Sequence, residues 1–186
     1  MQIRRSRFSA GQYLFAALIV AVAVSWSPNL VSRLFAKPAA SMAGVAYVTT
    51  SDIDAALRQM PATSTTYDKP IKTVDTGAYK VTIVILRRIP GKTPDSSLLH
   101  DRVTEVYHIL TGSGTFETGG VLVDGKPVDL TPEAAGPSTR GTIQGGETRP
   151  IGPGDVVVIP PGVPHRFSHL DGDVTYLVTR IEAPRP

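Results

Sequence analysis

The chain has 186 residues, of which 41% are hydrophobic and 19% are charged, and this is enough for one globular domain with a single core. It contains no cysteine, which excludes disulfides, thiolate zinc sites and a cysteine nucleophile. The net charge is +3, but Arg4, Arg5 and Arg7 lie ahead of any folded domain, so this charge gives no support for nucleic-acid binding and none is expected.

Residues 1–36 are predicted to be a signal peptide or a membrane anchor. The three arginines precede an unbroken apolar run at 13–24, which is the order found in secretory signals. The uncharged stretch around this run is also long enough to span a bilayer if it stays helical, so cleavage and retention both remain open. Because the arginines come first, the positive-inside rule places the rest of the chain outside the cytoplasm. The protein is therefore expected to be periplasmic or secreted, or anchored to the inner membrane through this segment.

A linker is predicted at 37–50, followed by a barrel domain at 51–186 that begins with one short helix at 51–60. Ser51 is a suitable N-cap for this helix, acidic residues follow in its first turn, and Pro61 ends it.

The remaining sequence predicts short strands and tight turns. Its apolar residues are rich in Val and Ile, and the chain's 17 glycines and 16 prolines divide them into short runs, a pattern typical of an all-β barrel or sandwich. The 41 residues between Gly112 and Gly154 are predicted to be a turn-rich insertion, which either forms a rim or lid or is inert. Strands are predicted at 78–89, 103–111, 114–118, 121–124, 155–159, 165–170 and 174–181, with weaker ones at 71–75, around 143 and at 148–151.

Two short motifs carry the most specific information. In the first, His100 lies five residues before Glu105, and Glu105 is followed by six residues and Gly112. In the second, Gly154 is followed by five residues, a Pro-Pro-Gly turn, two residues and His165. Together they resemble the two signature motifs of the cupin superfamily, over roughly residues 97–181.

This resemblance implies an all-β double-stranded β-helix, the cupin jelly-roll barrel, with one short N-terminal helix and a membrane-targeting segment ahead of it. Two positions depart from the family pattern: Leu98 occupies the first histidine position, and His169 stands where an asparagine is expected. The resemblance also implies a homodimer, and Val106, His108 and Leu110, on the strand face opposite Glu105, would suit its interface.

His100, Glu105 and His165 are the candidate metal ligands. Two neutral imidazoles and one carboxylate on one face bind a divalent transition metal and leave positions open for water or substrate, so we expect Fe, Mn, Zn or Ni as the cofactor. Strand alternation tests this set, because His100 and Glu105 have opposite parity on a regular strand. A bulge or turn near Asp101 and Arg102 is therefore required.

Two further residues are assigned to the same site. Alternation along 165–169 places His169 on the face of His165, either as a fourth ligand or as a group that supports a ligand. Tyr107 shares the face of Glu105 and could donate a proton or hydrogen bond to a bound molecule, although filling the core is the favoured role for an inward tyrosine. If the protein is an enzyme, Glu105 and Tyr107 are the candidate catalytic residues.

The sequence leaves two functions open. One is a metal-dependent enzyme, for example an oxygenase, that acts on a small organic molecule in the barrel. The other is a non-catalytic module of the cell envelope that binds a sugar-like molecule or a metal, since the fold supports both. Scattered arginines either form an anion-recognising rim or are solvated; they are Arg87, Arg88, Arg140, Arg149 and Arg166.

Overall fold

The computed structural model describes residues 44–61, 64, 66–91 and 96–183. The predicted targeting segment at 1–36 and part of the predicted linker lie outside these residues. Within them, no helix is both long enough and apolar enough to cross a bilayer. Export and membrane attachment therefore stay predictions.

Helix α2 (Thr50–Leu57) begins one residue earlier than predicted. Its N-cap is Thr49, whose side chain accepts from the Asp52 backbone N–H while the Asp52 carboxylate accepts from the Thr49 backbone N–H. The prediction that Ser51 caps the helix is wrong, because this reciprocal capping box satisfies two free N–H groups at once. The hydroxyl of Tyr67 donates to the carbonyl of Ala56 and ties the helix to the first strand.

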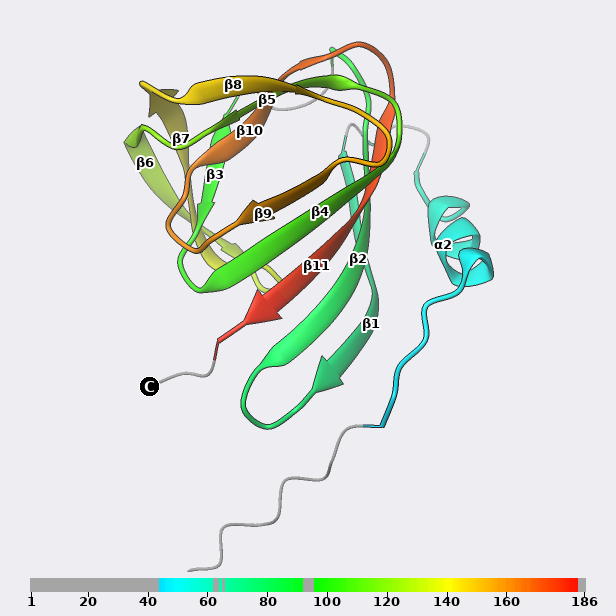
Figure 1. Cartoon of the computed structure of the whole chain (residues 1–186). Coiled ribbons are helices and arrows are strands. Elements are labelled where there is room, and N and C mark those ends of the chain that lie inside the picture. Colours follow the sequence, from blue (N-terminus) through cyan, green and yellow to red (C-terminus); the bar gives the residue numbers. More distant parts are fainter. Residues whose placement is uncertain (1–43, 62–63, 65, 92–95, 184–186) are drawn as a thin grey trace, which may run out of the picture. The chain divides into compact units, whose positions relative to one another are not determined.

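The rest of the described chain forms two antiparallel sheets (Figure 1). The first has the order β1-β2-β11-β4-β9 and the second the order β6-β7-β3-β10-β5-β8. The strands are β1 (Thr66–Asp75), β2 (Lys80–Arg88), β3 (Ser97–His100), β4 (Val103–Thr111), β5 (Gly114–Thr118), β6 (Val121–Leu130), β7 (Gly136–Gln144), β8 (Glu147–Ile151), β9 (Val156–Ile159), β10 (His165–Leu170) and β11 (Val174–Glu182).

The strand order is that of a double-stranded β-helix. Leaving aside β1, β6 and β7 at the edges, the chain passes from one sheet to the other at almost every connection, which gives β2-β11-β4-β9 facing β3-β10-β5-β8. Two four-stranded sheets connected in this way form a jelly roll. The predicted fold class is therefore confirmed.

The predicted insertion is more ordered than its turn-rich sequence suggested. After β5 the chain forms the hairpin β6–β7, and β7 pairs with β3 at the edge of the second sheet. Sequence analysis missed β3. It also missed most of this hairpin, because the two hairpin strands carry few apolar residues and include Gly125, Pro127 and Gly141. The hairpin thereby becomes part of the barrel wall.

The apolar core fills the space between the two sheets. Alternate residues of β2, β4 and β11 point into it, and they meet Phe116 and Phe167 from the facing sheet. Glu105, His100 and His165 are buried beside this core. The core residues from the first sheet include Val84, Leu86, Tyr107, Ile109, Tyr176 and Val178.

The outer face of the first sheet carries exposed apolar side chains at its β9 edge. Val156 and Val158 are 60% and 61% exposed, and they lie opposite His108 and Val106 in the β4–β9 register. His108 points outward, as its parity indicated. The homodimer interface that was expected on this face stays a prediction.

Candidate metal centre

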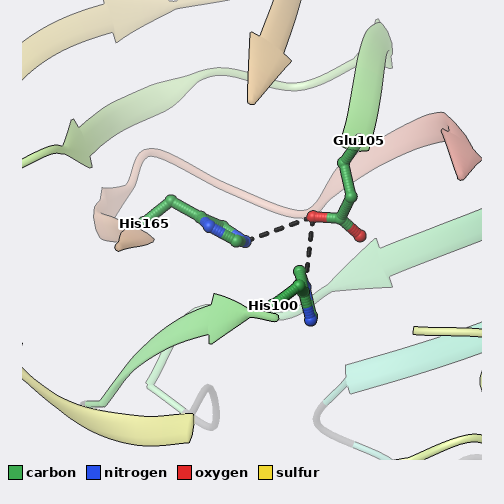
Figure 2. A group of neighbouring side chains, drawn as sticks. All are labelled: His100, Glu105 and His165. Carbon is green, nitrogen blue, oxygen red and sulfur yellow. Dashed lines mark ion pairs between the residues drawn. The ribbon is translucent and has the colours of Figure 1, made fainter. Parts of the chain in front are cut away.

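Three polar side chains converge in the barrel interior (Figure 2). His100 ends β3, Glu105 lies on β4 and His165 begins β10, and each is at most 4% exposed. Oε2 of Glu105 lies 3.3 Å from Nε2 of His100 and 3.2 Å from Nε2 of His165. Of the groups searched in the described part of the chain, this is the one whose ligand atoms could surround a metal ion.

The chain brings His100 and Glu105 together by changing sheets between them. Residues 101 and 102 form a bend, β3 belongs to one sheet and β4 to the other. The break in alternation that the ligand set requires is therefore present, and the side chains face each other across the interior.

The second motif places His165 against His100. Gly162, with a φ of 77°, adopts the left-handed conformation that the Pro-Pro-Gly turn requires. In this turn the backbone N–H of Gly162 donates to the carbonyl of His100 over 2.8 Å. The motif glycine thus joins the two ligand-bearing segments.

The hydrogen bonds of His165 fix its tautomer. Its Nδ1 lies 3.1 Å from the carbonyl oxygen of Val163, and a carbonyl only accepts, so Nδ1 carries the proton. The Nε2 lone pair of the neutral ring then points at Glu105. Metal-binding histidines are commonly held by a backbone carbonyl in this way.

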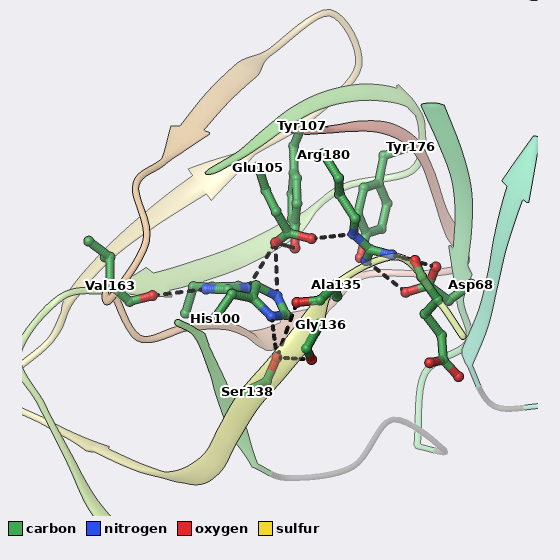
Figure 3. Close-up of polar contacts among 12 residues, drawn as sticks. Asp68, His100, Glu105, Tyr107, Ala135, Gly136, Ser138, Val163, Tyr176 and Arg180 are labelled. Atoms are coloured by element: carbon green, nitrogen blue, oxygen red, sulfur yellow. Dashed lines mark hydrogen bonds and ion pairs between the residues drawn. The ribbon is translucent and has the colours of Figure 1, made fainter. Parts of the chain in front are cut away.

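The ring of His100 is also held through its Nδ1, here by a residue of the inserted hairpin β6–β7 (Figure 3). Its Nδ1 lies 2.8 Å from Oγ of Ser138 on β7, and that hydroxyl donates to the carbonyl of Gly136 over 3.1 Å. Because a serine has a single proton to donate, Nδ1 of His100 must donate to Oγ. Its Nε2 lone pair also faces Glu105.

Two imidazole lone pairs directed at one carboxylate oxygen need a positive charge between them. A proton on Nε2 can supply it, and so can a metal ion. At metal–ligand distances of about 2.1 Å, neighbouring ligand atoms are about 3.0 Å apart in an octahedron and about 3.4 Å apart in a tetrahedron. The separations of 3.2 and 3.3 Å from Oε2 lie between these values. The residues therefore fit a divalent transition metal such as Fe, Mn, Zn or Ni, whose preferred donors include imidazole and carboxylate.

Arg180 holds the other oxygen of Glu105, and sequence analysis did not identify it. Its Nε donates to Oε1 over 2.8 Å, and its terminal nitrogens pair with Asp68 on β1 (Figure 3). It also donates to the carbonyl of Glu133, in the turn between β6 and β7. Its side chain is 4% exposed, and its inward parity with Tyr176 and Val178 on β11 was the signal in the sequence. With Oε1 bound to Arg180, Glu105 presents Oε2 alone to the histidines.

These contacts keep Glu105 ionised. Burial alone would raise its pKa, but hydrogen bonds from His100 and His165, which donate when their Nε2 atoms carry a proton, and the charge of Arg180 hold the pKa well below its usual range. The hydroxyl of Tyr107 donates to Oε2 over 3.0 Å. Burial and the nearby Glu105 charge raise the pKa of Tyr107 well above its usual value, so this hydroxyl stays protonated and remains a donor.

Of the two further residues assigned to this site, the structure places Tyr107 beside Glu105 and His169 away from it. Tyr107 points inward as expected, but its hydroxyl is engaged by Glu105, and its catalytic role stays a prediction. His169 does not join the group: its side chain is 67% exposed and lies beside Asp171. The assignment of His169 as a fourth or supporting ligand is wrong, because a register shift between Phe167 and His169 reverses the alternation.

Comparison with known proteins finds structural overlaps of low similarity and assigns no activity. No protein-family profile and no curated protein matches the sequence. Among solved structures, an uncharacterized double-stranded β-helix protein from Klebsiella pneumoniae has 11% identity and a TM-score of 0.46, over 75% of this chain and 91% of that one. A protein of unknown function from Rhizobium leguminosarum has 21% identity and a TM-score of 0.42, over 73% and 96% of the two chains.

The ribosomal oxygenase YcfD of Escherichia coli also overlaps the barrel. It has 20% identity and a TM-score of 0.41, and the overlap covers 56% of this chain but about a quarter, 23%, of the oxygenase. At these values the overlaps assign no activity. The cupin resemblance of the two motifs is confirmed at the level of the fold by the strand order of the barrel itself.

Proposed function

We propose that this chain binds a divalent transition metal through His100, Glu105 and His165 and acts as a metal-dependent enzyme on a small organic molecule. The observation that carries the proposal is the pair of anchored imidazoles, whose Nε2 lone pairs both face Oε2 of Glu105. When bound, the metal would supply a Lewis acid or a redox centre. Val163 and Ser138 would hold the two rings, and Arg180 would fix the carboxylate.

Elemental analysis of the purified full chain tests the metal site. We expect near-stoichiometric metal in the wild type and none in His165→Ala or Glu105→Ala, because two remaining ligands bind a divalent ion weakly. His169→Ala is the matched control, since this histidine is exposed and outside the group, and it should retain the wild-type content. A wild type that stays empty after incubation with Fe(II), Mn(II), Zn(II) and Ni(II) would contradict the proposal.

The hairpin contact to His100 gives a second prediction. Ser138→Ala should weaken metal affinity about 10- to 100-fold, because the serine fixes the tautomer and orientation of the ring. Competition with a chromophoric chelator measures the change. Ser168→Ala, which removes an exposed hydroxyl on β10, is the control and should leave the affinity unaltered. Equal affinities in all three proteins would show that the hairpin does not support the ligand.

A non-catalytic metal-binding module is the second candidate. It is favoured by the burial of all three ligands, each at most 4% exposed, and by the engagement of both Glu105 oxygens. Metal-dependent oxygen consumption with candidate substrates would establish the enzyme. A loaded protein that turns over no substrate under oxygen, yet keeps its metal through dialysis, would establish the binding module.

We also infer that the barrel is exported, on the basis of the arginines and apolar run at 1–36. A C-terminal fusion to alkaline phosphatase, which is active only outside the cytoplasm, tests this. The full chain should give an active fusion, and deletion of residues 1–36 should abolish phosphatase activity without lowering the amount of protein. Equal activity from both fusions would contradict export through this segment.

A further inference from the structure

A second cavity lies at the end of the barrel, apart from the metal centre. Its volume is about 400 Å³, which falls within the range of about 300–1,000 Å³ that small-molecule sites occupy. Its walls come from the turn between β1 and β2, the turn between β6 and β7, and the end of β11. None of His100, Glu105 and His165 lines it. The cavity is therefore a ligand site that the proposed function does not use.

One wall of this cavity carries a row of three charged side chains, Asp75, Lys80 and Glu182. In the register of the first sheet, Lys80 lies directly opposite Asp75 on β1 and directly opposite Glu182 on β11. Glu182 comes two residues after the buried Arg180, so both point to the inner side of the sheet. The two carboxylates therefore flank the ammonium group and lie two strand spacings, roughly 10 Å, apart.

The charges of this row are not paired with one another. Opposite charges in cross-strand register attract, yet within the described part of the chain Lys80 forms no ion pair with Asp75 or Glu182. Asp75 uses Oδ1 to accept from the backbone N–H of Gly77 over 2.8 Å, and its Oδ2 stays available. At neutral pH the wall thus offers one ammonium and two carboxylates to a ligand, with a net charge of about −1.

The opposite wall is a turn of small residues that the barrel holds in place. Ala134 has a φ of 62°, a left-handed conformation that is uncommon for a residue with a side chain and that persists where the surroundings fix it. The carbonyl of the preceding Glu133 accepts from Arg180, which ties the turn to the buried ion cluster. A wall fixed in advance loses little entropy when a ligand binds. Its lining residues are Thr131, Ala134, Gly136 and Pro137.

Tyr79 adds an aromatic surface beside the charged row. Its side chain is 46% exposed and lines the cavity. The Thr76 hydroxyl holds its backbone, since it accepts from the Tyr79 N–H over 3.1 Å and donates to the Tyr79 carbonyl over 2.8 Å. The face of a tyrosine ring attracts ammonium groups. Ring and carboxylates together favour a ligand with cationic groups.

We propose that this cavity binds a basic amino acid, a zwitterion that carries a second cationic group. Its carboxylate pairs with Lys80 and its two cationic groups pair with Asp75 and Glu182, so each charge of the row gains an opposite partner. A diamine would leave Lys80 unpaired, and an amino acid with an apolar side chain would leave one carboxylate unpaired. The site does not depend on the metal, because no metal ligand lines the cavity.

Calorimetric titration of the full chain, purified in detergent, with lysine tests the proposal. The protein is first treated with a chelator, so that coordination of the amino acid by a metal cannot contribute to the heat. Cadaverine lacks the carboxylate of lysine, and norleucine lacks its side-chain ammonium. We expect saturable binding of lysine and at least tenfold weaker binding of both analogues.

Substitutions in the charged row identify the partner of each ligand group. Lys80→Met should weaken lysine binding at least tenfold without weakening cadaverine binding, because only lysine has a carboxylate. Asp75→Asn and Glu182→Gln should each weaken lysine binding. Lys69→Met, at an exposed lysine of β1 outside the cavity, is the matched control and should change the affinity less than twofold. Circular dichroism checks that every variant is folded, which their partly or fully exposed positions favour.

Two results would overturn the proposal. One is a wild type that lysine does not saturate, and the other is a Lys80→Met protein that binds lysine as tightly as the wild type. Because the titrated protein holds no metal, either result would leave the proposed metal centre standing. Loss of metal from Glu105→Ala with unaltered lysine binding would support two independent sites.

Discussion

Replacing Arg180 by methionine is expected to lower the free energy of unfolding by about 3–5 kcal/mol, the cost of breaking a buried ion pair by removing one partner. The guanidinium is the shared cation of Glu105 and Asp68, and its side chain is 4% exposed. Methionine fills much of the same volume, so the loss would arise mainly from two carboxylates left without their positive partner. Urea unfolding of the metal-free protein, followed by circular dichroism, measures the difference.

Arg149→Met is the matched control for this prediction. Arg149 also pairs with a glutamate, Glu147, but the two side chains are 75% and 67% exposed, and such surface pairs contribute at most about 1 kcal/mol. The stability deficit of Arg180→Met should also shrink at low pH, where Glu105 becomes neutral and no longer needs a positive partner. If the two arginine variants are equally stable, the buried ion cluster does not support the fold.

The two motifs predicted the fold and the convergence of His100, Glu105 and His165 because both depend on short sequence spacings. A glycine at the end of a strand, or a Pro-Pro-Gly turn before His165, sets the backbone conformation of its own turn. This conformation does not depend on which distant strand pairs with the segment. The requirement for a break between His100 and Glu105 followed from alternation alone, and the bend at residues 101–102 meets it.

The supporting residues could not be found in this way, because they depend on pairing between distant strands. Ser138 holds His100 only because β7 pairs with β3 and brings the two residues into register. Arg180 meets Glu105 through the β4–β11 register. No spacing in the sequence encodes either contact. His169 was assigned wrongly for a different reason. Perfect alternation along β10 was assumed, but one extra residue in this strand turns the His169 side chain outward.

The metal-free protein is expected to lose stability in acid through Glu105. The pKa of this carboxyl is held well below its usual range by His100, His165 and Arg180 against the opposing effect of burial, whereas in the unfolded chain it is about 4.3. A group whose pKa is lower in the folded state stabilises the fold above its unfolded pKa. That contribution disappears as the pH falls from about 4.3 to the folded-state pKa, at up to about 1.4 kcal/mol per pH unit for one proton.

Carbon NMR of the Glu105 carboxyl reports this titration directly. In the metal-free protein its resonance should remain that of an ionised group as the pH falls through about 4.3, and it should change together with acid unfolding. In urea-unfolded protein the same resonance should titrate near that value. A folded-state midpoint at or above 4.3 would mean that burial outweighs the three cationic or donating neighbours. In that case the ionisation of Glu105 would contribute no stability to the folded state at neutral pH.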